Sequence, residues 1–458
     1  MPKVNIEGDL NGCFTVNGVD FSRLTVENWQ AVLATLTAPI YQPMDGWVPV
    51  GRGSEPWLLR VAHKTFDNVR DIIDCQTMYS TANAGHGNMD ILLPVALQTL
   101  HESGARTGNA LPNILQLPAF FALTGLVGGG YRVMTKLGGG EAVETAIKLA
   151  RTFFWALHGE PAEEHMGHGP YLVVAKSCFH GRPLGVTSTF ERGDPSRDGF
   201  GPFADATIWV PFNDIGALYN VLHTRTDIAA VLLEPIQGEG GINIPDDDYL
   251  PKVAALCREH GVLFILDEVQ TGFGRTGKNF AFEHHDGLKP DILALGKALG
   301  GGALSASATL ARTDVSFDGG KTTHDLFSYF GPGREGQTWL GADTVCMAIL
   351  ASIKELCDKD HAALAAENGA RFIAELKELQ EKYPRLITDV RGKGLMVGAD
   401  FTIPGRTLSH ALLDEGVWAY YTGPEKKTLR FLPPLVTPPE VLSEVVVRLE
   451  RALLRLLR

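Results

Sequence analysis

The stretch from residue 262 to residue 302 most constrains what this chain can fold into. Residues 262–266 are five consecutive apolar residues after a glycine, too few for an independent helix, and they predict a buried parallel strand. This strand ends on Asp267. A second apolar strand, predicted over residues 291–295, leads to Lys297, just before a run of three glycines. An acid and a lysine therefore each follow the carboxyl end of a buried strand.

Open parallel sheets bind ligands at the carboxyl ends of their strands, so Asp267 and Lys297 are expected to face one crevice. A lysine in an apolar, glycine-lined place is poorly solvated, which favours its neutral, nucleophilic amine. A buried aspartate needs a cationic partner. Pyridoxal 5'-phosphate (PLP) meets both needs, because its aldehyde condenses with a lysine and its protonated ring nitrogen pairs with a carboxylate. The spacing alone equally fits an ion-paired strand end at Asp267 and a solvated loop lysine at Lys297.

The segment 272–279, GFGRTGKN, offers an alternative of another class. It nearly matches the G-x-x-x-x-G-K-[ST] phosphate-binding loop of nucleotide hydrolases. Its last residue is Asn279, which lacks the hydroxyl that binds magnesium, and no clear helix follows it. These departures disfavour a nucleotide hydrolase.

The same region carries a resemblance. LDEVQTGFGRTG followed by KPDILALGKALGGG resembles the signature of the class III, PLP-dependent aminotransferases, which include ornithine, acetylornithine and 4-aminobutyrate aminotransferases. Asp267, Gln270 and Lys297 are in register with that signature. The resemblance implies that Lys297 holds the cofactor covalently and moves the substrate proton, that Asp267 keeps the ring nitrogen protonated, and that Gln270 bonds near the ring hydroxyl. It extends from about Tyr41 to the carboxyl end.

Length and composition limit the number of domains, the classes of partner and the cellular location. A chain of 458 residues is long enough for two domains, and a net charge of −12 argues against nucleic acid or an anionic membrane as a general partner. The six cysteines form no C-x-x-C pair, and no segment approaches eighteen uninterrupted apolar residues. We expect a cytoplasmic protein. The His-rich segment 158–168 is expected to be a solvated insertion, so no metal site is predicted.

The order of predicted elements indicates an α/β fold. Strands are predicted over 131–135, 171–175, 206–210, 229–233, 262–266, 291–295 and 306–310, and helices over 26–36, 141–157, 215–223 and 249–260. With the resemblance, this predicts a fold-type-I PLP-dependent transferase: a large domain with a mainly parallel central sheet over 86–335, plus a smaller α+β domain from the N-terminal segment 1–85 and the C-terminal segment 336–458. A terminal helix is expected to begin with a capping box, Thr437-Pro-Pro-Glu440.

A glycine-rich turn precedes the helix predicted over 141–157. Gly138, Gly139 and Gly140 would let backbone N–H groups approach an anion at the helix N-terminus. The turn also aligns with the phosphate cup of the resembled family. That family usually has serine or threonine where this chain has Gly138, so one side-chain hydroxyl contact to the phosphate is either missing or supplied elsewhere.

Other residues have roles implied by the resemblance alone. Phe179 would lie on the cofactor ring, and Arg182 would bind a substrate carboxylate. Glu239 would pair with Arg430 as a switchable gate. Thr338 would reach the cofactor phosphate of the neighbouring subunit, which implies a homodimer with shared active sites, and Tyr41 and Tyr79 would line an ornithine pocket.

The predicted reaction is therefore a ping-pong transfer of a terminal amino group from an ω-amino acid to 2-oxoglutarate. This would give a semialdehyde and glutamate, with small molecules as partners. L-Ornithine is the preferred donor because Tyr41, Tyr79, Arg182, Glu239 and Arg430 are all present. Acetylornithine, lysine at its ε-amine and 4-aminobutyrate remain alternative donors. An amino-acid racemase or epimerase and a non-catalytic cofactor-binding protein also remain open.

Overall fold

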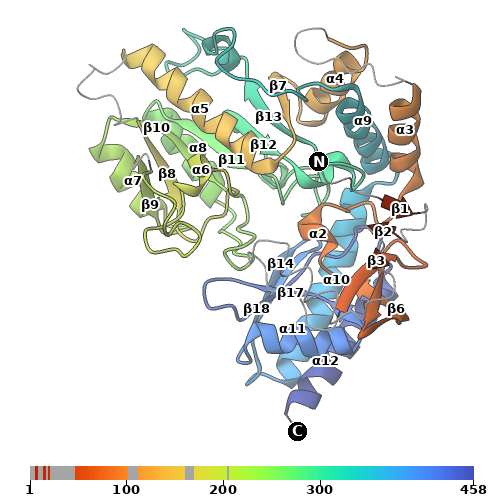
Figure 1. The fold of residues 1–458 in the computed structure, drawn as a ribbon. Coiled ribbons are helices and arrows are strands. Elements are labelled where there is room, and N and C mark those ends of the chain that lie inside the picture. Colours follow the sequence, from red (N-terminus) through yellow and green to blue (C-terminus); the bar gives the residue numbers. More distant parts are fainter. Residues whose placement is uncertain are drawn as a thin grey trace.

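The computed structural model describes residues 6–8, 14–16, 19–20, 47–101, 112–159, 170–203 and 206–457. The helix predicted over 26–36, Tyr41, and most of the His-rich segment lie outside these ranges. Figure 1 shows two bodies, one above the other: an upper body around β7–β13 and a lower body around β14–β18 and α10–α12.

The upper body is built on a seven-stranded sheet in the order β7-β13-β12-β11-β10-β8-β9. β13 runs antiparallel to both of its neighbours, and the other pairs are parallel. The sheet is therefore mainly parallel, as predicted, and all seven strands lie within two residues of their predicted bounds. The strands are β7 (Tyr131–Lys136), β8 (Tyr171–Ala175), β9 (Thr207–Val210), β10 (Ile228–Leu233), β11 (Leu263–Asp267), β12 (Ile292–Leu295) and β13 (Ser307–Arg312).

Both faces of this sheet are covered, which explains its continuous apolar strands. In β11, Phe264 and Leu266 pack into the cluster on one face, whereas Leu263 and Ile265 pack into the cluster on the other. One face is covered by α5 (Gly139–His158), shown in gold in Figure 1. The opposite cluster includes residues of α4 (Gln116–Leu126), α7 (Ile215–Thr224), α8 (Tyr249–Glu259) and α9 (Asp343–Asp358). Because β8, β9, β10, β11 and β12 run parallel to one another, their carboxyl ends meet at one edge of the sheet.

The lower body combines segments from both ends of the chain. Its four-stranded sheet has the order β14-β15-β18-β17 and packs with α10, α11 and α12. A second sheet, β16-β6-β5-β4, joins residue 417 to Ile73 through a parallel pair. The elements are β4 (Trp47–Arg52), β5 (Leu58–His63), β6 (Thr65–Asp74), α10 (His361–Lys382), β14 (Ile387–Lys393), β15 (Met396–Phe401), α11 (Gly405–Asp414), β16 (Val417–Trp418), β17 (Tyr420–Thr422), β18 (Thr428–Phe431) and α12 (Pro439–Leu456).

The predicted capping box of α12 is wrong. The N-cap is Pro438, not Thr437, and no side chain caps the helix. The Thr437 hydroxyl is buried without a hydrogen-bond partner in the part of the chain that the structure describes. With proline at both following positions, the helix begins one residue later than the box requires, because proline needs no N–H partner at a helix start.

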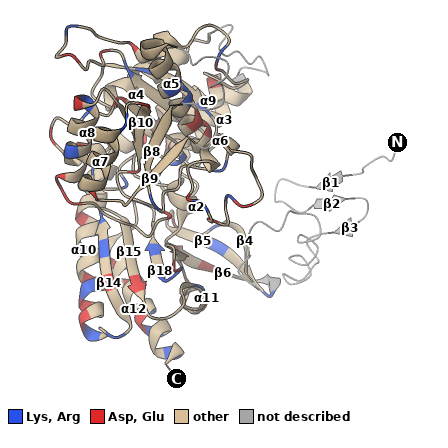
Figure 2. Cartoon of the chain, turned by 90° about the vertical axis from the view of Figure 1, so that its left-hand side faces the viewer, with Lys and Arg blue, Asp and Glu red and all other residues tan. Residues whose placement is uncertain are grey.

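β1 (Ile6–Gly8), β2 (Phe14–Val16) and β3 (Val19–Asp20) form a separate three-stranded sheet. The remaining described elements are α2 (Thr77–Ser80), α3 (Met89–His101), α6 (Leu184–Thr187) and the 3₁₀ turns η3 (Ala281–His284), η4 (Lys297–Gly300) and η5 (Leu326–Tyr329). Figure 2 shows basic and acidic residues interspersed along α10 and α12. Within the described ranges, no helix has the length and apolar character needed to cross a bilayer.

Candidate active site

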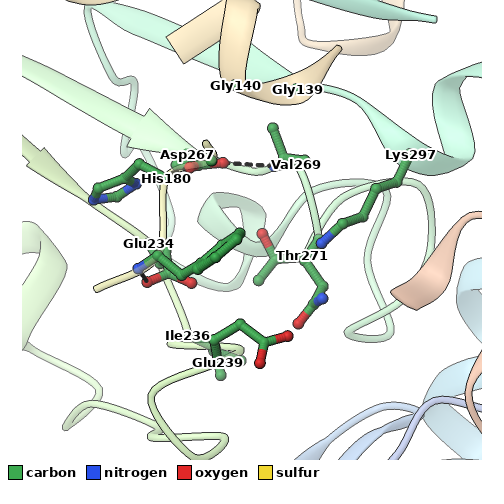
Figure 3. Close-up of a pocket in the computed structure, with 13 residues that line it drawn as sticks. Gly139, Gly140, His180, Glu234, Ile236, Glu239, Asp267, Val269, Thr271 and Lys297 are labelled. Atoms are coloured by element: carbon green, nitrogen blue, oxygen red, sulfur yellow. Dashed lines mark hydrogen bonds and ion pairs between the residues drawn. The ribbon is translucent and has the colours of Figure 1, made fainter. Parts of the chain in front are cut away.

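A cavity lies where the central sheet ends, and its lining residues all belong to the upper body. Figure 3 shows its lining side chains converging from the ends of several strands and from the start of α5. Of the predicted site residues, the structure brings seven together here. The lining is Gly139, Gly140, Phe179, His180, Gly181, Glu234, Ile236, Glu239, Asp267, Val269, Gln270, Thr271 and Lys297.

Asp267 is the last residue of β11 and is fixed at both carboxylate oxygens. Oδ1 accepts the Val269 N–H at 3.0 Å, and Oδ2 lies 2.8 Å from Nδ1 of His180. Both side chains are almost fully buried. Burial disfavours a charged imidazole, but Cys178 and Asp267 together raise the pKa of His180 well above its ordinary value. A buried carboxylate held in this way can pair with a cation in the cavity.

Lys297 begins η4 directly after β12 and extends into the cavity opposite Asp267 (Figure 3). Burial, and next the positive charge of Arg430, lower the pKa of Lys297 to about 8. A Cβ at Gly296 would lie 3.2 Å from the Cα of Gly139, so the chain at Lys297 passes close to the start of α5. The lysine is thus a neutral amine in a much larger fraction of molecules than an exposed lysine at the same pH.

The start of α5 accepts only glycine at two positions. A Cβ on Gly139 would lie 2.6 Å from Cγ1 of Val269, and one on Gly140 would lie 2.6 Å from Cδ of Pro183. Gly138 does not line the cavity, and its N–H donates to Oε2 of Glu141 at 2.7 Å. Of the three predicted glycines, Gly139 and Gly140 line the cavity at this helix end.

Glu239 and Arg430 form an ion pair at the floor of the cavity. Nη1 of Arg430 donates to Oε1 of Glu239 at 2.6 Å, and the Arg430 side chain is fully buried. Burial opposes ionisation of Glu239, but Arg430 outweighs it and lowers the pKa of the carboxyl. Nε and Nη2 of Arg430 have no hydrogen-bond partner among the described residues, and its guanidinium lies 5.2 Å from the centre of the Tyr79 ring. The ion pair thus contains a buried guanidinium with two nitrogens, Nε and Nη2, that make no hydrogen bond to the described residues.

The remaining predicted residues lie outside the cavity wall. Arg182 is exposed, with its guanidinium 5.4 Å from the Phe179 ring, and Thr338 is exposed in the loop before α9. Tyr79 lies in α2, beside Arg430, and its carbonyl accepts a 3.4 Å hydrogen bond from Gln270. Tyr41 lies outside the described residues.

Two ionisable cavity residues had been assigned no role from the sequence, His180 and Glu234. Glu234 accepts the N–H groups of Phe179 and Gly238, both at 3.0 Å, and burial raises its pKa to about 7. The sequence does carry a signal for Glu234, because this carboxylate directly follows strand β10. Asp267 has the corresponding place at the end of strand β11. His180 had no such signal, because its bond to Asp267 joins residues 87 positions apart.

The cavity has the chemical groups that PLP requires. An amine on one wall faces a carboxylate on the other, and a helix N-terminus that tolerates no Cβ lies beside them. Oε1 of Gln270 is a buried acceptor without a partner in the described part of the chain, as a site for a hydroxyl-bearing ring requires. The residues present therefore fit this cofactor.

The segment 272–279 does not form a phosphate-binding loop. It is followed by the 3₁₀ turn η3, and not by an α-helix with free N–H groups. Arg275 within it is fully buried, and its guanidinium donates to four oxygens of the surrounding chain: Oγ of Ser80, Oδ1 of Asn83 and the carbonyls of Leu395 and Pro433. Through Arg275, this segment links residues 80–83 to the β14–β15 turn and to the residues after β18.

Comparison with known proteins agrees with this site. The chain matches the model of the class III aminotransferases over residues 65–453. It is 34% identical over 421 residues to the ornithine aminotransferase of Bordetella pertussis, covering 91% of this chain and 93% of that one. The structure of the ornithine aminotransferase from Toxoplasma gondii, with PLP partially occupying its active site, matches with a TM-score of 0.81 at 27% identity and covers 94% of this chain and 95% of that one. The acetylornithine aminotransferase from Elizabethkingia anophelis matches with a TM-score of 0.76 at 30% identity over 94% and 99% of the two chains. This chain therefore belongs to the class III aminotransferases, PLP-dependent enzymes of fold type I.

Proposed function

We propose that this enzyme transfers the terminal amino group of L-ornithine to 2-oxoglutarate, giving a semialdehyde and glutamate in a ping-pong reaction. The observation that carries the proposal is the Glu239–Arg430 pair, because it places a buried cation with unused donors beside Lys297. The names of the most similar relatives support ornithine as the donor.

Each cavity residue has a proposed task toward the cofactor. Bound PLP withdraws electrons from the substrate carbon that carries the amine, which makes the hydrogen on that carbon acidic. Lys297 holds the cofactor covalently and, once released by substrate, moves this proton as a base whose pKa of about 8 suits the task. Asp267, oriented by His180, keeps the ring nitrogen protonated. Phe179 lies on the ring, Gln270 bonds the ring hydroxyl, and the N–H groups of Gly139 and Gly140 bind the phosphate.

The Glu239–Arg430 pair allows two differently charged substrates to use one cavity. While the pair is closed, the arginine is neutralised, and a donor that itself ends in an ammonium group meets no free cation. When Glu239 moves away, the guanidinium is free to bind a carboxylate of 2-oxoglutarate with its planar donors. Tyr79, beside Arg430, and Tyr41 are proposed to contact the donor.

We also propose a homodimer with shared active sites. Large apolar side chains are exposed on α3 and α4, which both pack against α9; they include Leu100 (74%), Leu117 (78%) and Phe121 (78%). Such a face is typical of a surface covered by another subunit. The exposed Thr338 in the loop before α9 would then contact the partner's cofactor phosphate, while Arg182 would contact a substrate carboxylate.

Two further proposals concern domains and location. The chain divides into an N-terminal segment 1–85, a large domain 86–335 and a small domain 336–458; the two bodies have separate apolar clusters, which supports the division except at α9, whose side chains pack into the cluster of the large body. A cytoplasmic location is supported by the described cysteines, Cys75, Cys178, Cys257, Cys346 and Cys357, which are free thiols, as in a reducing compartment.

The test is the visible absorption of the purified holoenzyme during single additions of L-ornithine, acetylornithine, lysine or 4-aminobutyrate. We expect L-ornithine to abolish the visible band of the bound cofactor fastest and 2-oxoglutarate to restore it. A Lys297→Ala variant is the control and should not complete the cycle. If the band survives every donor while one amino acid loses its optical activity, the enzyme is a racemase and the proposal is refuted.

A further inference from the structure

Strand β17 carries two side chains on the same face of its sheet as Arg430. β17 is the edge strand and pairs antiparallel with β18, with Tyr420 opposite Arg430 and Thr422 opposite Thr428. Residues directly opposite each other on neighbouring strands, and residues two apart on one strand, present their side chains to the same face. Tyr420 and Thr422 therefore flank the guanidinium that pairs with Glu239.

Thr422 holds Glu239 in the position seen here. Its buried hydroxyl lies 2.7 Å from the carbonyl oxygen of Glu239 and 3.4 Å from Oε2 of the same residue, while Oε1 is bound to Arg430. The N–H of Gly423 also donates to the Glu239 carbonyl, at 3.0 Å. Because a hydroxyl donates one proton, Thr422 bonds the carbonyl and thereby fixes the backbone of Glu239, with Oε2 close by, while Arg430 on β18 binds Oε1.

Tyr420 lies directly opposite Arg430 on the neighbouring strand, on the face where Arg430 binds Glu239. Its ring stacks on Tyr421, with centroids 4.5 Å apart and planes at 21°. Burial, then the Tyr421 hydroxyl, and then the nearby Tyr79 and Glu239 raise the pKa of the Tyr420 phenol. The phenol carries its proton and shares it with Tyr421 in this structure, so donation to a carboxylate would replace that bond.

We propose that Thr422 and Tyr420 are specificity-determining residues that hold Glu239 in its two positions. Thr422 anchors the backbone of Glu239 so that its carboxylate stays on Arg430, which suits the amino donor, and the Tyr420 hydroxyl receives the carboxylate after it has left Arg430, which suits a 2-oxo dicarboxylic acid. A carboxylate that leaves a buried guanidinium loses a charge-assisted hydrogen bond, so a second donor lowers the cost of opening. This inference rests on the proposed function of the Glu239–Arg430 pair.

The test compares Tyr420→Phe, which keeps the ring and removes the hydroxyl, with Thr422→Val. Each half-reaction is measured on the holoenzyme by stopped-flow absorption, with ornithine or with 2-oxoglutarate. Loss of one hydrogen bond to a charged group predicts that Tyr420→Phe lowers kcat/KM for 2-oxoglutarate by about tenfold and changes that for ornithine much less. Thr422→Val should move the ratio of the two constants in the opposite direction. Tyr219→Phe, an exposed tyrosine on α7, is the matched control.

Binding of glutarate, a dicarboxylate without an oxo group, gives a readout that needs no turnover. Calorimetry on the holoenzyme should show about tenfold weaker glutarate binding in Tyr420→Phe, and no weakening in Thr422→Val. The inference is overturned if both variants move the ratio in the same direction, or if Tyr420→Phe binds glutarate as the wild type does. If the wild type rejects ornithine but binds glutarate, the proposed donor is wrong, and the glutarate comparison still decides the roles of Tyr420 and Thr422.

Discussion

Arg275 gives the most direct test of how the two bodies are joined. Its fully buried guanidinium donates to Ser80, Asn83, Leu395 and Pro433 at 2.6–2.9 Å. These acceptors belong to the N-terminal segment, the β14–β15 turn and the segment that follows β18. Replacing Arg275 with lysine removes the planar fork, so one amino group must replace several directed bonds.

The expected cost follows from these contacts. We expect at least two of the four hydrogen bonds to be lost, and a bond to a charged group contributes about 1.5–3 kcal/mol, so Arg275→Lys should lower the free energy of unfolding by about 3–6 kcal/mol. An unfolding entropy of about 2.1 cal/mol/K per residue corresponds to about 1 kcal/mol/K for 458 residues unfolding together. The melting temperature should therefore fall by about 3–6 °C.

The assay is thermal unfolding of the holoenzyme followed by far-UV circular dichroism. Arg455→Lys is the matched control, because its side chain is 57% exposed and its ion pair with Asp414 is a surface pair. Such pairs contribute about 1 kcal/mol or less. A melting temperature for Arg275→Lys equal to that of Arg455→Lys would refute the reasoning.

Three further predictions concern the cofactor site and the dimer. Because Lys297 has a pKa of about 8, the rate at which cofactor-free protein recombines with added PLP, followed by absorption, should rise with pH through about 8; a rise only near the ordinary lysine value would contradict the role of burial. Gly140→Ala should weaken PLP binding because its Cβ meets Pro183 at 2.6 Å, whereas Gly138→Ser, whose Cβ approaches nothing closer than 3.4 Å, should retain PLP at least as well as the wild type in equilibrium dialysis. Phe121→Glu should shift the protein toward monomers in sedimentation velocity, since a charge on the exposed face of α4 opposes burial against a second subunit; an unchanged sedimentation coefficient would place the subunit contact elsewhere.

The sequence by itself determined the central sheet and the position of two reactive residues on it. Short apolar runs bounded by glycine and proline have few alternatives to buried strands, so the seven strands were predicted within two residues. The carboxyl ends of parallel strands share one edge, which is why Asp267 and Lys297 were expected in one cavity before any coordinates were known. The family resemblance added Gln270, Phe179, Glu239 and Arg430, which local patterns did not distinguish from ordinary core or surface residues.

Only the tertiary structure decided which of these groups contact one another. The bond between His180 and Asp267, the four contacts of Arg275 and the register that sets Tyr420 beside Arg430 join residues far apart in the chain or in different strands. The use of the Gly138 N–H by Glu141 depended on the conformation of a single turn. Periodicity reports which face of an element is buried, but not which element packs against it. Such contacts arise when the chain closes over long loops, and no local pattern encodes that step.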